Sequence, residues 1–289
     1  MTNRKIIQIV PALEVDEGAG VSVFRSIGTP ARRNLDPFLM LDQFNTDDPD
    51  DYIAGFPDHP HRGFNTFTYM LDGHMRHGDS MGNRGDLGPG GAQWMKAGSG
   101  VIHSEMPQQE SGRMRGFQLW INLSAEQKMT APEYQEVSQK VIPEIEIDGV
   151  VIRIVAGEID GQRGPVIDPV TQFQYLDVSM PKGGSFDHIL SDVYTAFIYM
   201  IEGGVSVADT DLQEQQLGVL GTGEQLSVKV GNESARFLLV AGKPIGEPIV
   251  QYGPFVMNSR DEIEQALEDY RLGQLVQTKA EMTNYEGNT

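Results

Sequence analysis

The sequence contains no cysteine, and it has few basic residues and no long apolar run. Without cysteine there are no disulfides, thiolate ligands or thiol nucleophiles, so any metal ion must bind through nitrogen and oxygen. With 22 Lys and Arg against 41 Asp and Glu, the formal net charge is −19, which opposes contact with a phosphate backbone. We therefore expect no direct binding to nucleic acid, and we interpret the small basic group Arg25, Arg32 and Arg33 as a solvated surface.

The N-terminus has no apolar run of signal-peptide length, and nowhere do about 18 apolar residues follow one another. These features predict a cytoplasmic protein with no membrane partner. Almost no stretch shows a sustained helical spacing of apolar residues, whereas 33 glycines and 16 prolines are scattered along the chain. This composition is typical of many short strands joined by turns.

A repeat indicates how the 289 residues are organised. The segment TFTYMLDG at 66–73 recurs as AFIYMIEG at 196–203, and each is followed by a glycine-rich turn. The first copy alternates aromatic and smaller residues with the period of a strand. Strands joined by such turns form small antiparallel barrels or double-sheet jelly rolls, the group that includes cupins. We predict an all-β fold of two cupin-type barrels, with an N-terminal metal-binding domain at 1–133 and a C-terminal degenerate domain at 134–289.

One helix is predicted near the C-terminus. Ser259 followed three residues later by Glu262 is a capping-box pattern, and apolar residues at helical spacing follow it. The pattern predicts a helix over about 260–272. The polar tail beyond Thr278 is expected to be frayed.

Five of the six histidines lie between residues 59 and 103, and three of them belong to paired motifs. In DHPH, His59 and His61 are two positions apart, which on a strand places both imidazoles on the same face. In HSE, His103 and Glu105 are spaced in the same way. Two such strands facing each other would offer three imidazoles and one carboxylate, a set suited to a divalent transition metal rather than to Ca²⁺ or Mg²⁺.

A single His-x-His pair is more often an ordinary polar strand, and only the co-occurrence of both pairs beside glycine-rich turns favours a metal site. His74 and His77 follow the turn at Asp72 and Gly73, so we interpret them as solvated hairpin residues. Four apolar side chains near the ligands either wall a pocket or belong to the barrel core, and core is the commoner outcome. They are Phe56, Phe64, Trp94 and Met106.

The second domain lacks the ligand pattern. In DHILSDVYTAF, with one extra residue allowed, His188 aligns with His59 but Leu190 stands in the place of His61. No His-x-Glu pair follows Leu220. The second barrel is therefore expected to be metal-free, with His188 a remnant or a surface residue.

Four blocks of the N-terminal half together resemble the pirins, a branch of the cupin superfamily: NLDPFLMLDQF, GFPDHPHRGFNTFTYMLDG, HGDSMGNRG and GSGVIHSEMP. The resemblance covers about 25–107. It implies the same four metal ligands, His59, His61, His103 and Glu105. Many pirins have Glu where this chain has Asn65, which is not a ligand position in the family but could alter the orientation of a ligand.

The resemblance also implies a function, because pirins are similar to quercetin 2,3-dioxygenases. On that basis one metal ion is expected, with Fe(II) as the first choice and Mn, Ni, Cu or Zn as alternatives. Glu105 is the expected catalytic residue: it, or a hydroxide on the metal, would remove the proton of a flavonol-like enol before dioxygen opens the ring with loss of carbon monoxide. The alternative is a non-enzymatic regulator. In this alternative the oxidation state of iron alters a surface that a protein partner recognises. A purely structural metal is a third reading, which open coordination positions disfavour.

Overall fold

The structure is a computed structural model of the chain, and it describes residues 2–286. The chain forms two compact units that alternate along the sequence. The unit called here the first barrel consists of 14–28, 38–141 and 245–286, and the second barrel consists of 2–13, 29–37 and 142–244. Within residues 2–286, no helix combines the length and the apolar character needed to cross a membrane.

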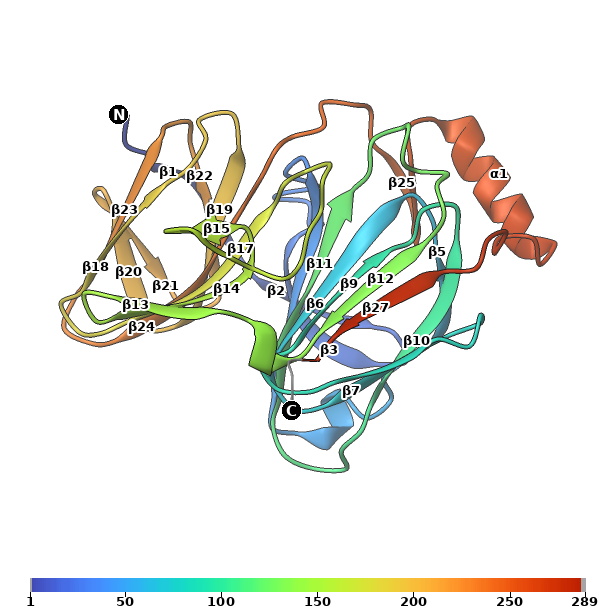
Figure 1. Cartoon of the computed structure of the whole chain (residues 1–289), viewed down its shortest axis with the longest axis horizontal. Helices are drawn as coiled ribbons and strands as arrows, with labels where there is room; N and C mark the ends of the chain where they lie inside the picture. The colour runs from blue at the N-terminus through green and yellow to red at the C-terminus, as the bar shows by residue number, and fades with distance from the viewer. Residues whose placement is uncertain (1, 287–289) are drawn as a thin grey trace. The chain divides into compact units, whose positions relative to one another are not determined.

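The first barrel contains an eight-stranded sheet and a four-stranded sheet. The large sheet has the order β2-β3-β4-β11-β6-β9-β12-β27, and several of its strands are labelled in Figure 1. Its strands are β2 (Leu13–Glu17), β3 (Val21–Ile27), β4 (Phe38–Thr46), β11 (Met114–Asn122), β6 (Phe64–Asp72), β9 (Ala92–Lys96), β12 (Glu133–Val137) and β27 (Glu281–Tyr285). The small sheet has the order β5-β10-β7-β8, with β5 (Phe56–His61), β10 (Val101–Pro107), β7 (Met75–Asp79) and β8 (Arg84–Leu87).

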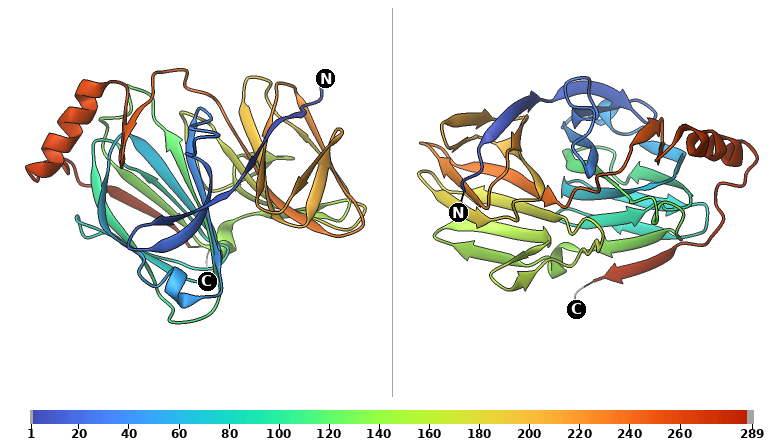
Figure 2. Two further views of the ribbon diagram at one scale, coloured as in Figure 1. Left: turned by 180° about the vertical axis from the view of Figure 1, so that it is seen from behind. Right: turned by 90° about the horizontal axis from the view of Figure 1, so that it is seen from above.

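The second barrel contains a seven-stranded sheet and a four-stranded sheet. The large sheet has the order β1-β22-β19-β24-β17-β14-β13. Its strands are β1 (Ile6–Pro11), β22 (Gln216–Leu220), β19 (Thr195–Glu202), β24 (Ala235–Gly242), β17 (Gln174–Met180), β14 (Val150–Ala156) and β13 (Glu144–Ile147). The small sheet has the order β18-β23-β20-β21, with β18 (Ser185–Ile189), β23 (Gln225–Val230), β20 (Gly204–Val207) and β21 (Thr210–Gln213). The N-terminal strand β1, blue in Figure 2, pairs with β22.

Strand order confirms the duplication that the repeat predicted. The run β4-β11-β6-β9 of the first barrel corresponds to β17-β24-β19-β22 of the second, and β5-β10-β7-β8 corresponds to β18-β23-β20-β21. The two copies of the repeated segment lie on β6 and β19, at equivalent positions in the two large sheets. The chain is therefore a mostly β protein with two cupin domains, as expected.

The predicted helix is present as α1 (Arg260–Arg271), and its capping box forms as expected. Ser259 accepts a bond from the backbone N–H of Glu262, and the Glu262 side chain bonds the backbone N–H of Ser259. The helix packs on the hairpin of β25 (Val250–Tyr252) and β26 (Phe255–Met257), which lies in the first barrel (Figure 1).

The two ends of the chain belong to units other than those expected from their positions in the sequence. The N-terminal strand β1 lies in the second barrel, and the C-terminal segment with α1 lies in the first. The division at 133/134 stays a prediction about the duplicated halves, because the compact units follow another division. The expectation of a frayed tail beyond Thr278 was wrong for Glu281–Tyr285, since this segment pairs with β12 as the parallel strand β27. Residues 287–289 of that tail lie outside the described residues.

Candidate metal centre

Strand β5 carries His59 and His61. It is the edge strand of the small sheet, where Pro57 and Pro60 are tolerated because a missing N–H at an edge breaks no ladder. The following residues hold the strand in place. The Arg62 guanidinium is buried against the carbonyl of Ser99, and at Gly63 a Cβ would come within 2.0 Å of the Val256 carbonyl oxygen.

Strand β10 lies beside β5 in antiparallel register, with His103 opposite His59. His103 and Glu105 are both buried, and their neighbours in the strand, Ser104 and Met106, are half-buried, so the period of two expected from HSE is present. The register shifts between the two residues, however, and Glu105 lies opposite Phe56. Glu105 therefore has no histidine of β5 directly opposite it.

Three imidazoles converge at this pair of strands. One ring nitrogen from each of His59, His61 and His103 lies within 4.8 Å of the others. The Nε2 atoms of His59 and His61 are 3.0 Å apart, and the three ring centroids are 4.4 to 4.9 Å from one another. His59 Nδ1 donates to the Pro57 carbonyl at 2.8 Å, so its Nε2 keeps a lone pair. His103 Nε2 is buried without a protein partner. A buried ring nitrogen without a partner, close to two further imidazole nitrogens, fits a shared cation, so the three histidines could hold a metal ion.

The electrostatic surroundings keep the imidazoles of His61 and His103 neutral. Burial, followed by the nearby His59 ring, lowers the pKa of His61 well below 6.5. Burial and the three neighbouring imidazoles do the same to the pKa of His103. The neutral ring is the form that binds a transition metal.

His77 is a member of the cluster that the sequence interpretation missed. The interpretation as solvated hairpin residues holds for His74, which is exposed, but it was wrong for His77, which is 2% exposed. His77 Nδ1 lies 3.2 Å from His103 Nδ1, and burial lowers the pKa of His77 to about 4. The alternation in β7, where Arg76 is exposed between the buried Met75 and His77, is the signal in the sequence that could have identified it.

Glu105 faces the same cavity but lies outside the three-histidine cluster. Gln118 Nε2 donates to its carboxylate oxygens at 3.3 and 3.5 Å. Thr68 Oγ1 lies 2.5 Å from Gln118 Oε1 and 3.3 Å from Glu105 Oε1, and its single proton is donated to one of them at a time. Glu105 as the fourth ligand therefore stays a prediction.

A cavity of about 620 Å³ opens beside this cluster within the first barrel. Of the four apolar side chains considered from the sequence, only Phe56 lines it. Phe64 and Trp94 are core residues, and Phe64 packs on the His61 ring at 5.0 Å between centroids. Trp120, which the sequence did not indicate, lines the cavity and lies 5.3 Å from His61 between ring centroids.

Arg25 also lines the cavity, so its interpretation as part of a solvated basic surface was wrong. Its guanidinium binds both carboxylate oxygens of Asp42 at 2.7 and 2.6 Å and reaches Glu17 at 2.7 Å. The Arg25 side chain is 17% exposed and the Asp42 side chain 6% exposed. The sequence did not predict this pair because Arg25 and Asp42 lie on different strands, β3 and β4, which the sheet places side by side with the two residues directly opposite each other.

The second barrel has apolar residues at the equivalent positions. His188 on β18 lies opposite Leu226 on β23, as His59 lies opposite His103. Leu190, Leu226 and Val228 are buried in the core. His188 is not a surface residue: it is 9% exposed, its ring stacks on Phe186, and its Nε2 bonds Gln174 Oε1 at 3.0 Å. The alternative interpretation, a remnant at the position of a ligand, agrees with its register.

Comparison with known proteins identifies the family. The profile described as Pirin matches residues 20–121, and the profile described as Pirin C-terminal cupin domain matches residues 175–276. A curated relative from Pseudomonas aeruginosa, named "Putative quercetin 2,3-dioxygenase", is 48% identical over 94% of this chain and 98% of its own length. The chain belongs to the pirin family.

Two further relatives extend the comparison. A pirin-like protein of Caulobacter vibrioides is 46% identical over 94% of this chain and 99% of its own length. The crystal structure titled quercetin 2,3-dioxygenase from Acinetobacter baumannii matches with a TM-score of 0.87 at 32% identity, covering 94% of this chain and 98% of that one. Two of these names state an activity and one states only the family.

Asn65 stands where the resemblance to the pirins led us to expect Glu. It is fully buried on β6, an odd number of positions from Thr68, which lines the cavity. Because alternate side chains of a strand point to opposite faces, Asn65 points away from the face of Thr68. An effect of this residue on the cavity would be transmitted through the sheet and not by direct contact.

Proposed function

We propose that this pirin is a quercetin 2,3-dioxygenase-type oxidoreductase that opens a flavonol ring with dioxygen at one divalent transition metal, Fe(II). In this proposal His59, His61 and His103 are metal ligands and Glu105 completes the set. The observation that carries the proposal is the convergence of three buried or half-buried imidazoles, two of which, His59 and His61, line a cavity that is also lined by the buried carboxylate of Glu105. The family relationship supports it, because relatives over nearly the whole chain have names that state this activity. The cytoplasmic location expected from the sequence stays a prediction.

The metal would supply Lewis acidity towards a substrate oxygen and redox chemistry towards dioxygen. Three imidazole ligands, with or without one carboxylate, leave positions open on an ion that accepts about six ligands. Mn, Ni, Cu and Zn accept the same donors, so the identity of the metal has to come from elemental analysis.

Glu105 is suited to receive the hydroxyl proton of a flavonol. Burial raises its pKa, although the His59 ring and the bonds from Thr68 and Gln118 act in the opposite direction. A carboxylate with a raised pKa holds a transferred proton better than an exposed one does. The contacts from Gln118 and Thr68 fix the carboxylate on the sheet side of the cavity, so the same two residues orient it towards a bound substrate.

The apolar part of the cavity suits a flat aromatic substrate. Phe56, Met75 and Trp120 line it together with residues from β3 and β4. Their side chains would bind the ring faces and exclude water from the reacting centre.

The test is oxygen consumption and carbon monoxide release by the iron-loaded protein with quercetin. We expect turnover by the wild type, and loss of at least about 100-fold in Glu105→Gln, as removal of a general base does. His188→Ala, a histidine substitution in the other barrel, is the matched control and should keep full activity. Retention of iron without turnover of any flavonol would reject the dioxygenase proposal and favour the regulator that acts through a protein partner.

A further inference from the structure

A row of polar side chains crosses the large sheet of the first barrel at one level. Arg25 on β3 is paired with Asp42 on β4, Asp42 with Gln118 on β11, and Gln118 with Thr68 on β6. Directly paired residues of antiparallel strands point to the same face, and all four of these residues line the cavity. The row therefore runs along the cavity wall across four adjacent strands.

The two ends of this row have different partners. At one end, Thr68 and Gln118 contact Glu105, the carboxylate assigned to the reaction. At the other end, Arg25 and Asp42 form the two-bond ion pair that Glu17 joins. Neighbouring strands are about 4.8 Å apart, so Asp42 lies about 10 Å and Arg25 about 14 Å along the sheet from Thr68. This span can contain the central ring and one outer ring of a flavonol, with a hydrogen bond to a hydroxyl at each end.

Apolar side chains flank the row on the same face. Two positions away along the same strands lie Val23 on β3, Met40 and Phe44 on β4, and Trp120 on β11, and all four line the cavity. An aromatic ligand can therefore lie on an apolar wall while its ends meet polar groups.

The charge at the far end selects among ligand groups. Arg25 contributes one positive charge, and Asp42 and Glu17 contribute two negative charges, so the cluster is net negative. Each carboxylate oxygen that Arg25 occupies has a second lone pair that can accept a hydrogen bond. Such a cluster accepts a neutral hydroxyl donor, while a carboxylate, sulfonate or phosphate on the ligand meets like charge.

We propose that Arg25, Asp42 and Glu17 form a recognition subsite for a phenolic hydroxyl on the outer ring of a flat aromatic substrate. The carboxylates of Asp42 and Glu17 accept a hydrogen bond from the hydroxyl, and Arg25 holds Asp42 in place. The inference rests on the proposed function in one respect, that a flavonol-like substrate occupies this cavity with the reacting hydroxyl of its central ring towards Glu105. It assigns the substrate class as flavonols that carry a hydroxyl on one outer ring in addition to the reacting hydroxyl on the central ring.

The experiment measures equilibrium binding to the metal-loaded full chain under nitrogen, by quenching of tryptophan fluorescence. The probes are 3-hydroxyflavone, which has no hydroxyl on its outer rings, quercetin, which has hydroxyls on both, and a quercetin sulfonate. A hydrogen bond to a charged group corresponds to roughly a tenfold change in affinity. We expect the wild type to bind quercetin about tenfold more tightly than 3-hydroxyflavone and to bind the sulfonate most weakly.

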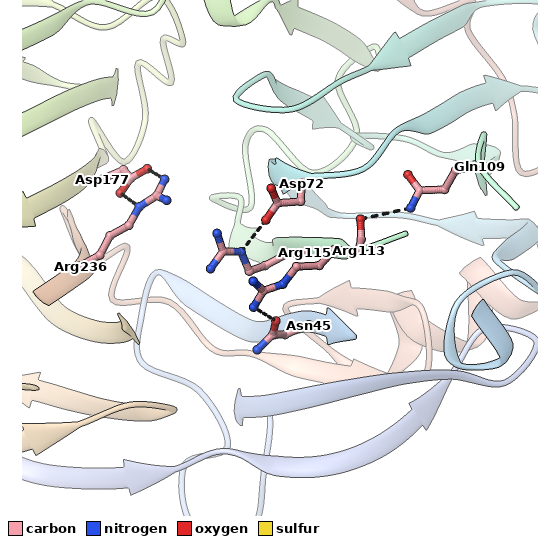
Figure 3. A network of polar contacts seen from close by, with 7 residues as sticks. All are labelled: Asn45, Asp72, Gln109, Arg113, Arg115, Asp177 and Arg236. Carbon is pink, nitrogen blue, oxygen red and sulfur yellow. Dashed lines mark hydrogen bonds and ion pairs between the residues drawn. The ribbon is translucent and has the colours of Figure 1, made fainter. Parts of the chain in front are cut away.

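The variants separate this subsite from general effects on the fold. Asp42→Asn should lose the preference for quercetin while binding 3-hydroxyflavone within about twofold of the wild type. Glu17→Gln tests the same acceptor role. Because the Glu17 side chain is 40% exposed, this substitution is not expected to prevent folding. The Glu17→Gln variant should bind the sulfonate more tightly than the wild type does. The control is Asp177→Asn, which breaks another two-bond pair between aspartate and arginine, with Arg236 in the second barrel (Figure 3), and should leave all three affinities unchanged.

Two results would overturn the subsite: equal affinity of the wild type for the two unsulfonated flavonols, or an equal weakening of both in Asp42→Asn and Glu17→Gln. Turnover of quercetin combined with either result leaves the dioxygenase function in place and rejects the subsite alone. The expected binding pattern without oxygen consumption supports the subsite and rejects the dioxygenase function.

Discussion

Arg62 and Asp269 lie 207 residues apart in the chain, and they form an ion pair of 2.7 Å between Nη1 and Oδ2. Arg62 directly follows the ligand strand β5, and Asp269 lies in the last turn of α1. The same guanidinium donates to the carbonyls of Ser99 and Leu275. The C-terminal segment is thereby tied to the end of the strand that carries His59 and His61.

Removal of the Asp269 carboxylate should destabilise the first barrel. The Arg62 side chain is 1% exposed, so Asp269→Ala leaves a buried charge without its counter-ion, which costs about 3 kcal/mol. Urea denaturation followed by tryptophan fluorescence measures the loss, because Trp94 and Trp120 both lie in the first barrel. Glu264→Ala, which breaks the exposed pair with Arg260 on the same helix, is the control and should change stability by about 0.5 kcal/mol or less. Equal effects of the two substitutions would refute this role of the pair.

His77 should determine how well His103 binds metal. The ring nitrogen of His77 fixes the Nδ1 side of His103, which leaves Nε2 directed at the cluster. Loss of such a partner typically weakens metal affinity about 10- to 100-fold, and we expect this for His77→Phe. Competition with a chromophoric chelator measures the affinity. His74→Phe, at the exposed histidine three residues earlier, should bind metal as the wild type does, and an unchanged affinity in His77→Phe would contradict the role of His77.

Metal stoichiometry should depend on the first barrel alone. We expect one divalent ion per chain by elemental analysis, and loss of most of it in the double variant His61→Ala, His103→Ala, because only one ligand of the three-histidine cluster remains. His188→Ala should keep the full complement, since Leu190 and Leu226 occupy the places of its would-be partners. A full complement in the double variant would eliminate the proposed site.

The second barrel should lose stability in mild acid through His188. Burial lowers its pKa from 6.5 to about 4, with Asp160 acting in the opposite direction. Between those pH values the unfolded chain binds a proton at His188 that the folded chain does not. The free energy of unfolding is therefore highest above pH 6.5 and decreases as the pH falls towards 4. The slope is about 1.4 kcal/mol per pH unit for one such group.

Urea denaturation followed by circular dichroism at pH 7 and pH 5 tests this, with the metal-free protein. We expect His188→Gln to be less sensitive to acid than the wild type, although it is less stable at pH 7. His74→Gln, which changes an exposed histidine, should retain the sensitivity of the wild type. Identical pH dependence of His188→Gln and the wild type would rule out His188 as the titrating group.

Two other polar contacts of the first barrel, one ion pair and one hydrogen bond, are not expected to affect the site. Arg115 bonds Asp72 at 2.8 Å, and Arg113 bonds Asn45 at 3.1 Å, as Figure 3 shows. None of these four residues lines the cavity. They are suitable positions for further control substitutions.

Local pattern in the sequence determined much of this protein. The period of two in TFTYMLDG and its repeat placed equivalent strands in both barrels, and the capping box placed α1. The same period predicted that His59 and His61 share a face of one strand and that His103 and Glu105 share a face of another. These features depend on residues close together in the chain, for which backbone geometry restricts where side chains can point.

The tertiary structure alone decided which strands became neighbours. It buried His77 against His103, brought Arg25 into register with Asp42, and joined Arg62 to Asp269 across most of the chain. It also placed β1 in the second barrel and α1 with β27 in the first. Periodicity within a strand states which side chains share a face but not which distant strand supplies the opposing residue, because that pairing is selected by the packing of the whole sheet.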